Sequence, residues 1–239
     1  MHSATSHHTD HQTNAVDDEP ILSHQFDDVE QQSEASTLGM WLFLATEVMF
    51  FGGLLTAYAI YRVRAHGEFA LASKELNVLL GCINTIVLLL SSLTMALAVR
   101  AAQLRSRREL VRWLGLTMIL GTAFLGIKAV EWTTDYHEHL IPGLNFQVPE
   151  KERSRVEQEG LDPRKMEMFF VLYFFMTGLH AIHLIIGIVL VGVMAYLSWR
   201  EWFSGGGAVQ IEVTGLYWHF IDIVWVFLYP LLYLIDVHQ

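Results

Sequence analysis

Five long apolar segments constrain this sequence most, because each is long enough to cross a lipid bilayer as a helix. They cover approximately residues 38–61, 76–99, 110–133, 169–199 and 214–236. Backbone groups inside a bilayer must find hydrogen-bond partners within their own segment, so each run is predicted to be helical. The runs are continuous and lack the alternation of a membrane β-barrel. The sequence therefore predicts an all-α membrane protein whose domain, residues 38–239, is a bundle of five transmembrane helices.

The first 37 residues differ in composition from everything that follows. They contain eight acidic residues and no lysine or arginine. A secretory signal would need a basic start and a short apolar run, and neither is present. Residues 1–37 are therefore predicted to form a disordered acidic tail.

Basic residues between the spans predict the orientation of the bundle. The short loop 100–112 carries five arginines, namely Arg100, Arg105, Arg107, Arg108 and Arg112. The positive-inside rule makes this loop cytoplasmic, which also places the N-terminus in the cytoplasm and the C-terminus outside. The loop 62–75 has three basic residues, and the loop 134–166 has five among seven acids. Within the longer loop, residues 150–160 are expected to form a short exposed helix.

Glu47 is an acidic residue inside the first apolar segment. A carboxylate at the centre of a bilayer costs roughly 2.5 to 3.5 kcal/mol, so its presence needs a reason. One interpretation is that Glu47 accepts and releases protons. Another is that it makes a hydrogen bond to a lipid or to a neighbouring helix, which would be a structural role.

His180 and His183 are three residues apart in the fourth span, which places them on one helix face. Such a pair could form one edge of a metal site, given further ligands from other helices. His219 and Asp222 in the last span are candidates, but antiparallel packing puts them near the opposite membrane face. Hydrogen bonds between helices are therefore the preferred prediction for all four residues.

Lys128 and Glu131 form an opposite-charge pair at i, i+3 in the third span, and Glu131 could also reach His180. Small residues predict close helix contacts at Gly52, Gly53, Gly121, Gly126, Gly178, Gly187 and Gly192. Residues near the ends of spans are candidates for interfacial anchoring or lipid contact. These are Trp41, Arg62, Trp132, Trp199, Trp202 and Trp218.

Composition excludes several functions. A net charge of −10 argues against nucleic acid as a partner. The single cysteine, Cys82, excludes an internal disulfide and a thiolate metal cluster. Three histidines in the spans are too few for two haems and a copper ion, so no redox centre is expected on this chain.

Five segments in order resemble subunit III of cytochrome c oxidase, a family of haem–copper oxidase subunits. They are Trp41–Tyr58 with Glu47, Asn84–Ser92, Glu131-Trp132, Phe174–Gly187 with His180 and His183, and Tyr217–Trp225 with His219 and Asp222. Larger members of the family have seven spans. This sequence lacks the two that precede the acid-bearing helix, and so is similar to five-span bacterial members.

The resemblance implies a haem-free core subunit of a proton-pumping terminal oxidase in the bacterial inner membrane, a cytochrome c oxidase of the caa3-like kind. Such a subunit supports assembly, stability, lipid binding and proton uptake, the last through Glu47. The implied partners are catalytic subunit I as the main contact, subunit II, and a small subunit IV. Haem a and copper would lie in those partners, and phospholipid would be bound in grooves of the bundle.

Other functions stay open at this stage. The closest alternative is a subunit III-like accessory of a nitric oxide reductase or of a quinol oxidase. A different class is a stand-alone proton-coupled transporter, although the sequence shows neither paired broken helices nor internal repeats. A membrane metal-binding protein using His180 and His183 is a further alternative.

Overall fold

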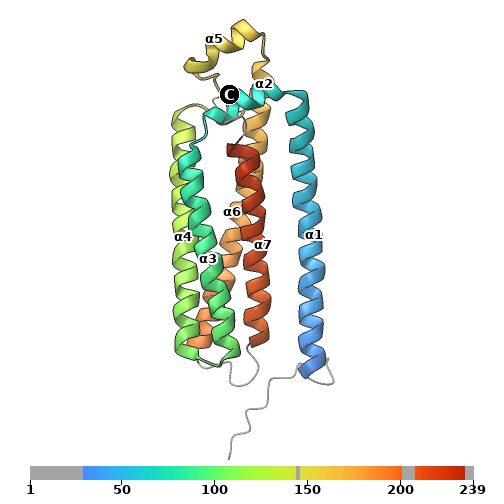
Figure 1. Cartoon of the computed structure of the whole chain (residues 1–239), viewed down its shortest axis with the longest axis vertical. Helices are drawn as coiled ribbons and strands as arrows, with labels where there is room; N and C mark the ends of the chain where they lie inside the picture. The colour runs from blue at the N-terminus through green and yellow to red at the C-terminus, as the bar shows by residue number, and fades with distance from the viewer. Residues whose placement is uncertain (1–28, 144–145, 201–207, 235–239) are drawn as a thin grey trace, which may run out of the picture.

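The computed structural model describes residues 29–143, 146–200 and 208–234, and this described part is helical without a strand. The helices are α1 (Val29–Arg64), α2 (His66–Lys74), α3 (Val78–Gln103), α4 (Arg107–His137), α5 (Glu150–Glu159), α6 (Pro163–Trp199) and α7 (Ala208–Tyr233). Five of them, α1, α3, α4, α6 and α7, are long and apolar enough to span a membrane (Figure 1). The predicted five-span all-α architecture is therefore confirmed.

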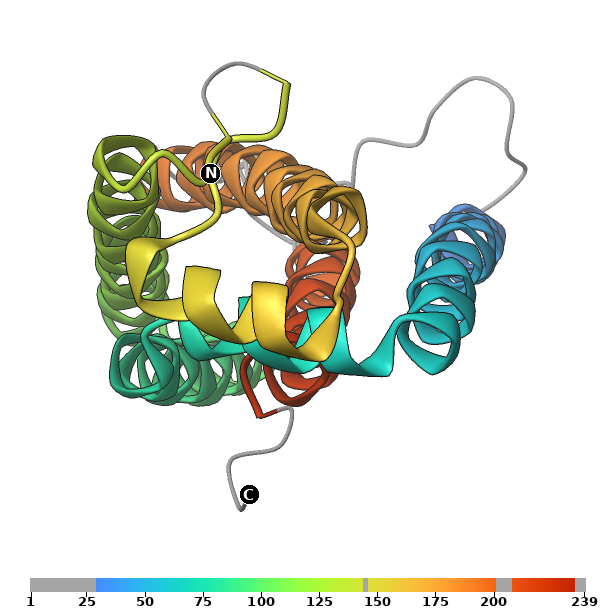
Figure 2. The same ribbon diagram turned by 90° about the horizontal axis from the view of Figure 1, so that it is seen from above.

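Four of the spanning helices form one body, and the fifth stands beside it. Viewed from above, α3, α4, α6 and α7 occupy the corners of a square, and α1 lies outside it (Figure 2). Large side chains fill the four-helix body, including the fully buried Phe124, Trp218 and Trp225. Along α1, by contrast, bulky apolar side chains such as Met49, which is 79% exposed, face outward.

Local sequence signals set the helix ends. Asn77 caps α3, because its side chain accepts a hydrogen bond from the backbone N–H of Leu80 at 3.1 Å. Asp162 caps α6 in the same way, accepting from Arg164 at 3.0 Å, with Pro163 in the first turn. The tight turn between α3 and α4 contains Arg105 at a positive φ of 53°.

The first helix is longer than the sequence predicts. It begins at Val29 rather than at residue 38, so residues 29–37 are helical and not a disordered tail. The reason is local: this stretch contains Glu, Gln and Ala, which favour helix, and it continues a helix that is already nucleated. Residues 1–28, Trp202 and the predicted end of the last span lie outside the described residues.

Two short helices cover one end of the bundle (Figure 2). The sequence predicts the second, α5, but treats α2 as a loop because it is too short and polar to span. It folds as a helix since Phe69 and Leu71 are buried. The sequence predicts that α5 is exposed. The helix is exposed only in part, because Glu152 and Val156 are buried.

Charged contacts hold α2 to α6. The Lys165 Nζ donates to Glu68 Oε1 at 3.1 Å, and the backbone N–H of Asp162 approaches the same oxygen at 3.5 Å. Burial by itself raises the pKa of Glu68, but these bonds and one from its own backbone N–H hold that pKa below its usual value. Burial raises the pKa of Glu75, and the carboxylates of Glu152 and Glu138 raise it further against the opposing charge of Lys151.

Glycines permit close packing in the four-helix body. A Cβ at Gly121 would lie 2.8 Å from the Trp218 ring, and one at Gly187 would lie 3.1 Å from Ile221. Gly192 and Gly178 also face neighbours, at 3.3 Å from Met118 and 3.9 Å from Trp132.

The prediction of close contacts is wrong within this chain for Gly52, Gly53 and Gly126, because a Cβ added at any of them would meet no neighbouring atom within 4 Å. Gly52 and Gly53 belong to α1, which stands outside the four-helix body (Figure 2).

The sequence predicts that Trp218 is an interfacial anchor, and this prediction is wrong because Trp218 is a core residue. It is fully buried, and its indole N–H donates to Ser91 Oγ at 3.2 Å. The error arises because α7 begins at Ala208, so that Trp218 lies ten residues inside the helix (208 to 218) instead of at its end.

We expect Gly121→Ala to destabilise the purified chain in detergent by about 1–3 kcal/mol, since overpacking a filled core has this cost. Thermal unfolding measures the effect. Gly126→Ala, on the same helix, is the matched control. Its Cβ meets nothing within 4 Å and alanine favours helix, so it should leave stability unchanged or slightly raised. Equal losses in both variants would contradict the packing described here.

Candidate functional site

Glu47 meets His183 across the space between α1 and α6. The Oε2 atom of Glu47 lies 3.1 Å from Nε2 of His183. The two side chains are 18% and 16% exposed, so the pair is largely shielded but remains reachable from outside the chain. The sequence singles out both residues, but it pairs His183 with His180 and leaves the partner of Glu47 open.

The hydrogen bonds of His183 determine how many protons the pair shares. Its Nδ1 lies 2.8 Å from the carbonyl oxygen of Leu179, which can only accept, so Nδ1 carries a proton. The contact between Nε2 and Glu47 then holds one further proton. Either an imidazolium donates to a carboxylate, or a protonated Glu47 donates to a neutral ring. In both cases one proton lies between the two side chains.

Aromatic contacts support this pair. The Phe51 ring packs edge-on against His183, with centroids 5.3 Å apart, and against Phe220 at 6.2 Å. Further along α1, the Tyr58 hydroxyl donates to the carbonyl oxygen of Leu231 at 2.6 Å. The α1 helix is thus held to the bundle by a narrow line of contacts.

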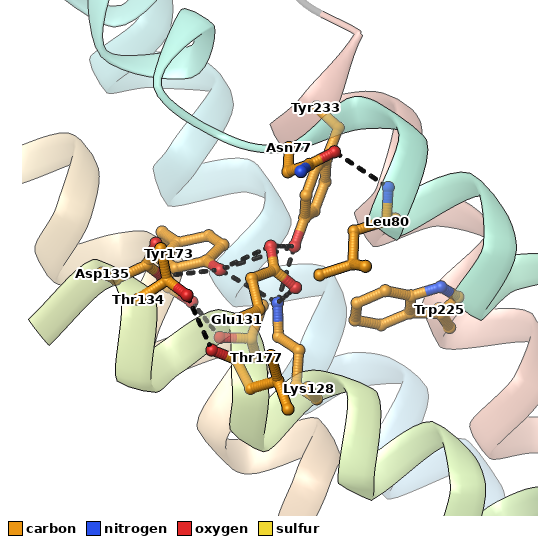
Figure 3. Close-up of polar contacts among 12 residues, drawn as sticks. Asn77, Leu80, Lys128, Glu131, Thr134, Asp135, Tyr173, Thr177, Trp225 and Tyr233 are labelled. Carbon is orange, nitrogen blue, oxygen red and sulfur yellow. Dashed lines mark hydrogen bonds and ion pairs between the residues drawn. The ribbon is translucent and has the colours of Figure 1, made fainter. Parts of the chain in front are cut away.

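A second polar group, the core cluster, lies inside the four-helix body. It consists of Lys128, Glu131, Asp135, Tyr173 and Tyr233, which come from α4, α6 and α7 (Figure 3). The Lys128 Nζ donates to Glu131 Oε2 at 3.0 Å, to the Tyr173 hydroxyl at 3.0 Å and to the Tyr233 hydroxyl at 2.6 Å. The predicted Lys128–Glu131 pair is therefore confirmed.

Both tyrosines also contact the carboxyl groups. Tyr233 donates to Glu131 Oε1 at 2.5 Å, and Tyr173 lies 3.1 Å from the same oxygen. The Tyr173 hydroxyl is also 3.3 Å from Asp135 Oδ2. The ammonium group of Lys128 lies over the rings of Tyr173 at 4.7 Å and Trp225 at 5.4 Å, which adds cation–π attraction. Every hydrogen of the Lys128 ammonium thus has an acceptor.

The other predicted polar residues do not join these sites. His180 is buried beside the rings of Phe124 and Trp225, at 5.6 Å and 5.1 Å. Neither of its nitrogens has a hydrogen-bond partner in the described structure, so the predicted contact with Glu131 is wrong. His180 and His183 are about 60° apart around the helix, which turns one toward the core and the other toward α1.

His219 and Asp222 lie on the α3 side of α7. The Ser92 hydroxyl is 2.8 Å from Nδ1 of His219, which fulfils the prediction of an interhelical bond for this histidine. Asp222 is buried, and Ser92 lies close to it, but its oxygens accept no hydrogen bond within the described residues. Among all the residues that the structure describes, no group of three or more His, Cys, Asp or Glu side chains could hold a metal ion.

The remaining predicted anchors occupy different environments. Trp41 and Trp199 are 58% and 63% exposed, as lipid- or interface-facing residues would be. Trp132 is half-buried and packs against Phe174 at 6.2 Å. Arg62 is half-exposed in the last turn of α1. The interfacial role of these four residues stays a prediction.

Sequence reasoning missed the tyrosines of the core cluster, as well as Asp135 and Trp225. Trp225 donates its indole N–H to the Thr85 hydroxyl at 3.1 Å. Asp135 carries a signal that could have been used, because it follows Glu131 by one helical turn. Tyr173 and Tyr233 carry none, since tyrosine is common near the ends of membrane spans.

We expect Lys128→Met to destabilise the chain by about 3–5 kcal/mol, because removing one partner of a buried ion pair leaves the other unpaired. Thermal unfolding and yield in detergent measure this. The double variant Lys128→Met/Glu131→Leu removes both charges and should recover much of the loss. A single variant as stable as the native chain would show that the pair is not essential to the core.

Residues 166–237, which include all of α7 and α6 from Met166 onward, match the family model of cytochrome c oxidase subunit III. The chain is 30% identical over 198 residues to cytochrome c oxidase subunit 3 of Synechocystis sp., covering 82% of this chain and 74% of that protein. It is 27% identical to cytochrome bo(3) ubiquinol oxidase subunit 3 of Pseudomonas aeruginosa, over 89% of this chain and 91% of the relative.

A third relative, quinol oxidase subunit 3 of Bacillus spizizenii, is 29% identical to this chain, and the match covers 87% of this chain and 93% of the relative. The matches extend over nearly the whole chain, and the family model covers helices that supply both His183 and the core-cluster tyrosines. The chain therefore belongs to the subunit III family of haem–copper oxidases, and is a multi-pass membrane subunit of an oxidoreductase complex.

Proposed function

We propose that this chain is a haem-free subunit III of a proton-pumping aerobic terminal oxidase, a cytochrome c oxidase of the caa3-like kind. It stabilises the catalytic subunit and assists proton uptake by that subunit. The observation that carries the proposal is the Glu47–His183 pair, which shares one proton at a partly accessible position between α1 and the bundle.

The positions of the histidines support a role without haem on this chain. A histidine that binds haem iron needs a free ring nitrogen facing open space. His183 uses both nitrogens, and His219 bonds Ser92 through one. His180 is enclosed by Phe124 and Trp225. Haem a and copper would then belong to the partner subunits.

Proton uptake fits the chemistry of the pair. A carboxyl group and an imidazole in contact can exchange a proton, because each can donate in its protonated form and accept in its deprotonated form. The pair is neither sealed in the core nor fully exposed on the surface of the chain, since its side chains are 16% and 18% exposed. It can therefore accept a proton from one side and pass it to a group on an adjoining subunit.

The exposed surface of α1 supports a contact with other molecules in the complex. Leu42 and Met49 are 69% and 79% exposed, and Gly52 and Gly53 leave a flat surface beside them. We assign this face to catalytic subunit I and to bound phospholipid, because a smooth apolar helix face packs well against another helix or acyl chains. Subunit II and a small subunit IV complete the proposed assembly.

Charge supports an inner-membrane orientation with the N-terminus in the cytoplasm and the C-terminus outside. The five arginines of the α3–α4 turn region are all exposed at the end of the bundle opposite α2 and α5 (Figure 1). Exposed basic residues near short loops favour the cytoplasmic side. The end covered by α2 and α5 would then face outward.

Quinol is the second candidate electron donor, since two of the relatives described above are quinol oxidase subunits. The donor would bind partner subunits, so an experiment on the complex has to decide. When this chain is tagged and purified from native membranes in mild detergent, we expect a reduced-minus-oxidised spectrum with an a-type haem. Oxygen consumption should be supported by reduced cytochrome c.

The alternative outcomes of this purification are distinct. Oxygen consumption with quinol but not with cytochrome c would replace the proposed donor. Only b- and c-type haem with nitric oxide reduction would mean a nitric oxide reductase. Absence of any haem protein from the purified material would contradict the proposed function.

We expect Glu47→Gln to leave assembly intact, because the amide keeps a hydrogen bond to His183. The variant should slow proton uptake or shorten the catalytic lifetime several-fold, since the shared proton is lost. Stopped-flow proton uptake and the decay of oxygen consumption during turnover measure the two effects. Glu34→Gln, an exposed acid on the same helix, is the matched control and should behave as the native complex. Native kinetics in Glu47→Gln would rule out this role.

A further inference from the structure

The core cluster contains more negative than positive groups. It has two carboxyl groups, Glu131 and Asp135, and one ammonium group, Lys128, and all three side chains are between 2% and 4% exposed. A buried net charge is costly, and a buried group loses its charge rather than remain unpaired. The geometry points to a one-proton binding site, in which Asp135 carries the proton and Tyr173 links it to Glu131.

The hydrogen bonds show which carboxyl group is ionised. Glu131 receives bonds from Lys128 at 3.0 Å, from Tyr233 at 2.5 Å and from Tyr173 at 3.1 Å. Three donors of this kind stabilise a carboxylate. Asp135 reaches the core cluster through its 3.3 Å contact with the Tyr173 hydroxyl, and it lies farther from Lys128 along α4. The proton therefore belongs on Asp135.

The Tyr173 hydroxyl distinguishes the two protonation states. It has a single proton but faces two carboxyl oxygens, one on Glu131 and one on Asp135. With Asp135 protonated, Asp135 donates to the Tyr173 oxygen while Tyr173 donates to Glu131, so each short contact contains a hydrogen. With Asp135 ionised, one of the contacts brings two acceptors together without a proton.

The same arrangement allows a balanced proton transfer. The O–H bond of Asp135 breaks as a new O–H bond forms on Tyr173. The original Tyr173 proton moves to Glu131, where it forms an O–H bond. The net change is one proton moved from Asp135 to Glu131, with one negative charge moved the opposite way. No oxidant or reductant is involved.

The core cluster is buried but lies close to one end of the bundle. Asp135 lies two residues before the end of α4, about 3 Å along the helix axis, and its carbonyl accepts from the Leu140 N–H at 3.0 Å. On the opposite side, Trp225 and Phe124 pack edge-on at 4.8 Å and close the core. The core cluster thus binds a proton from one face rather than conducting it across.

The groups that face Asp135 define its electrostatic environment. Glu131 and Lys128 on α4 oppose each other, Tyr173 on α6 supplies the hydrogen bond, and the exposed Glu138 at the end of α4 adds a negative charge. Tyr233 on α7 reaches it through Glu131 and Tyr173. Protonation at this site would therefore tighten the contact between α4 and α6, and proton release would loosen it.

Infrared difference spectroscopy of the purified complex, recorded while the pH is changed, tests this inference. We expect the native complex to show the C=O stretch of a buried carboxylic acid that titrates as one group. Asp135→Asn should remove that signal. The matched control Glu138→Gln, which alters an exposed acid three residues away, should retain it.

Two further variants keep the test decisive if Asp135→Asn does not assemble. Asp135→Glu should shift the signal rather than remove it. Tyr173→Phe should move it to the frequency of a carboxylic acid without a hydrogen-bond partner. A native signal in Asp135→Asn, or its loss in Glu131→Gln with retention in Asp135→Asn, would overturn the assignment to Asp135. This test concerns the core cluster alone, and its outcome does not depend on the role of Glu47.

Discussion

The Lys128–Glu131 ion pair is the contact on which the four-helix body depends. Neither charge has access to water in the bundle, so each must be satisfied by protein groups. The tyrosines of α6 and α7 supply those groups, which fixes both helices against α4 at one depth. The glycines at Gly121 and Gly187 then allow Trp218 to fill the space further along the bundle. One polar cluster and one packed tryptophan therefore set the register of the body.

The first helix, α1, is attached to the bundle by a different kind of contact. It has no comparable buried charge cluster in the described structure, and it is joined to the bundle by aromatic contacts, the Tyr58 hydrogen bond and the Glu47–His183 pair. Most of its surface is left for other molecules. A helix of this kind suits a subunit that lies against a larger partner.

The parts of the structure that depend on local chemistry could be predicted from the sequence. Hydropathy and length define the five spans, and helical spacing alone pairs Lys128 with Glu131. Contacts between distant segments could not be predicted in this way. Tyr233 lies 102 residues from Glu131, and nothing in its neighbourhood distinguishes it from an interfacial tyrosine. Glu47 stands out as a charge in an apolar run, but its partner depends on how α1 packs, 136 residues from His183.

A cryo-electron microscopy structure of the native complex in lipid, at a resolution that defines side chains, would test the central claim most directly. We expect Glu47 to lie within hydrogen-bond distance of His183, with the pair directed toward a neighbouring subunit or an ordered water that leads to it. We also expect the haem density to lie in partner subunits. A Glu47 carboxyl directed into lipid with His183 turned away, or a haem held by this chain, would contradict the account.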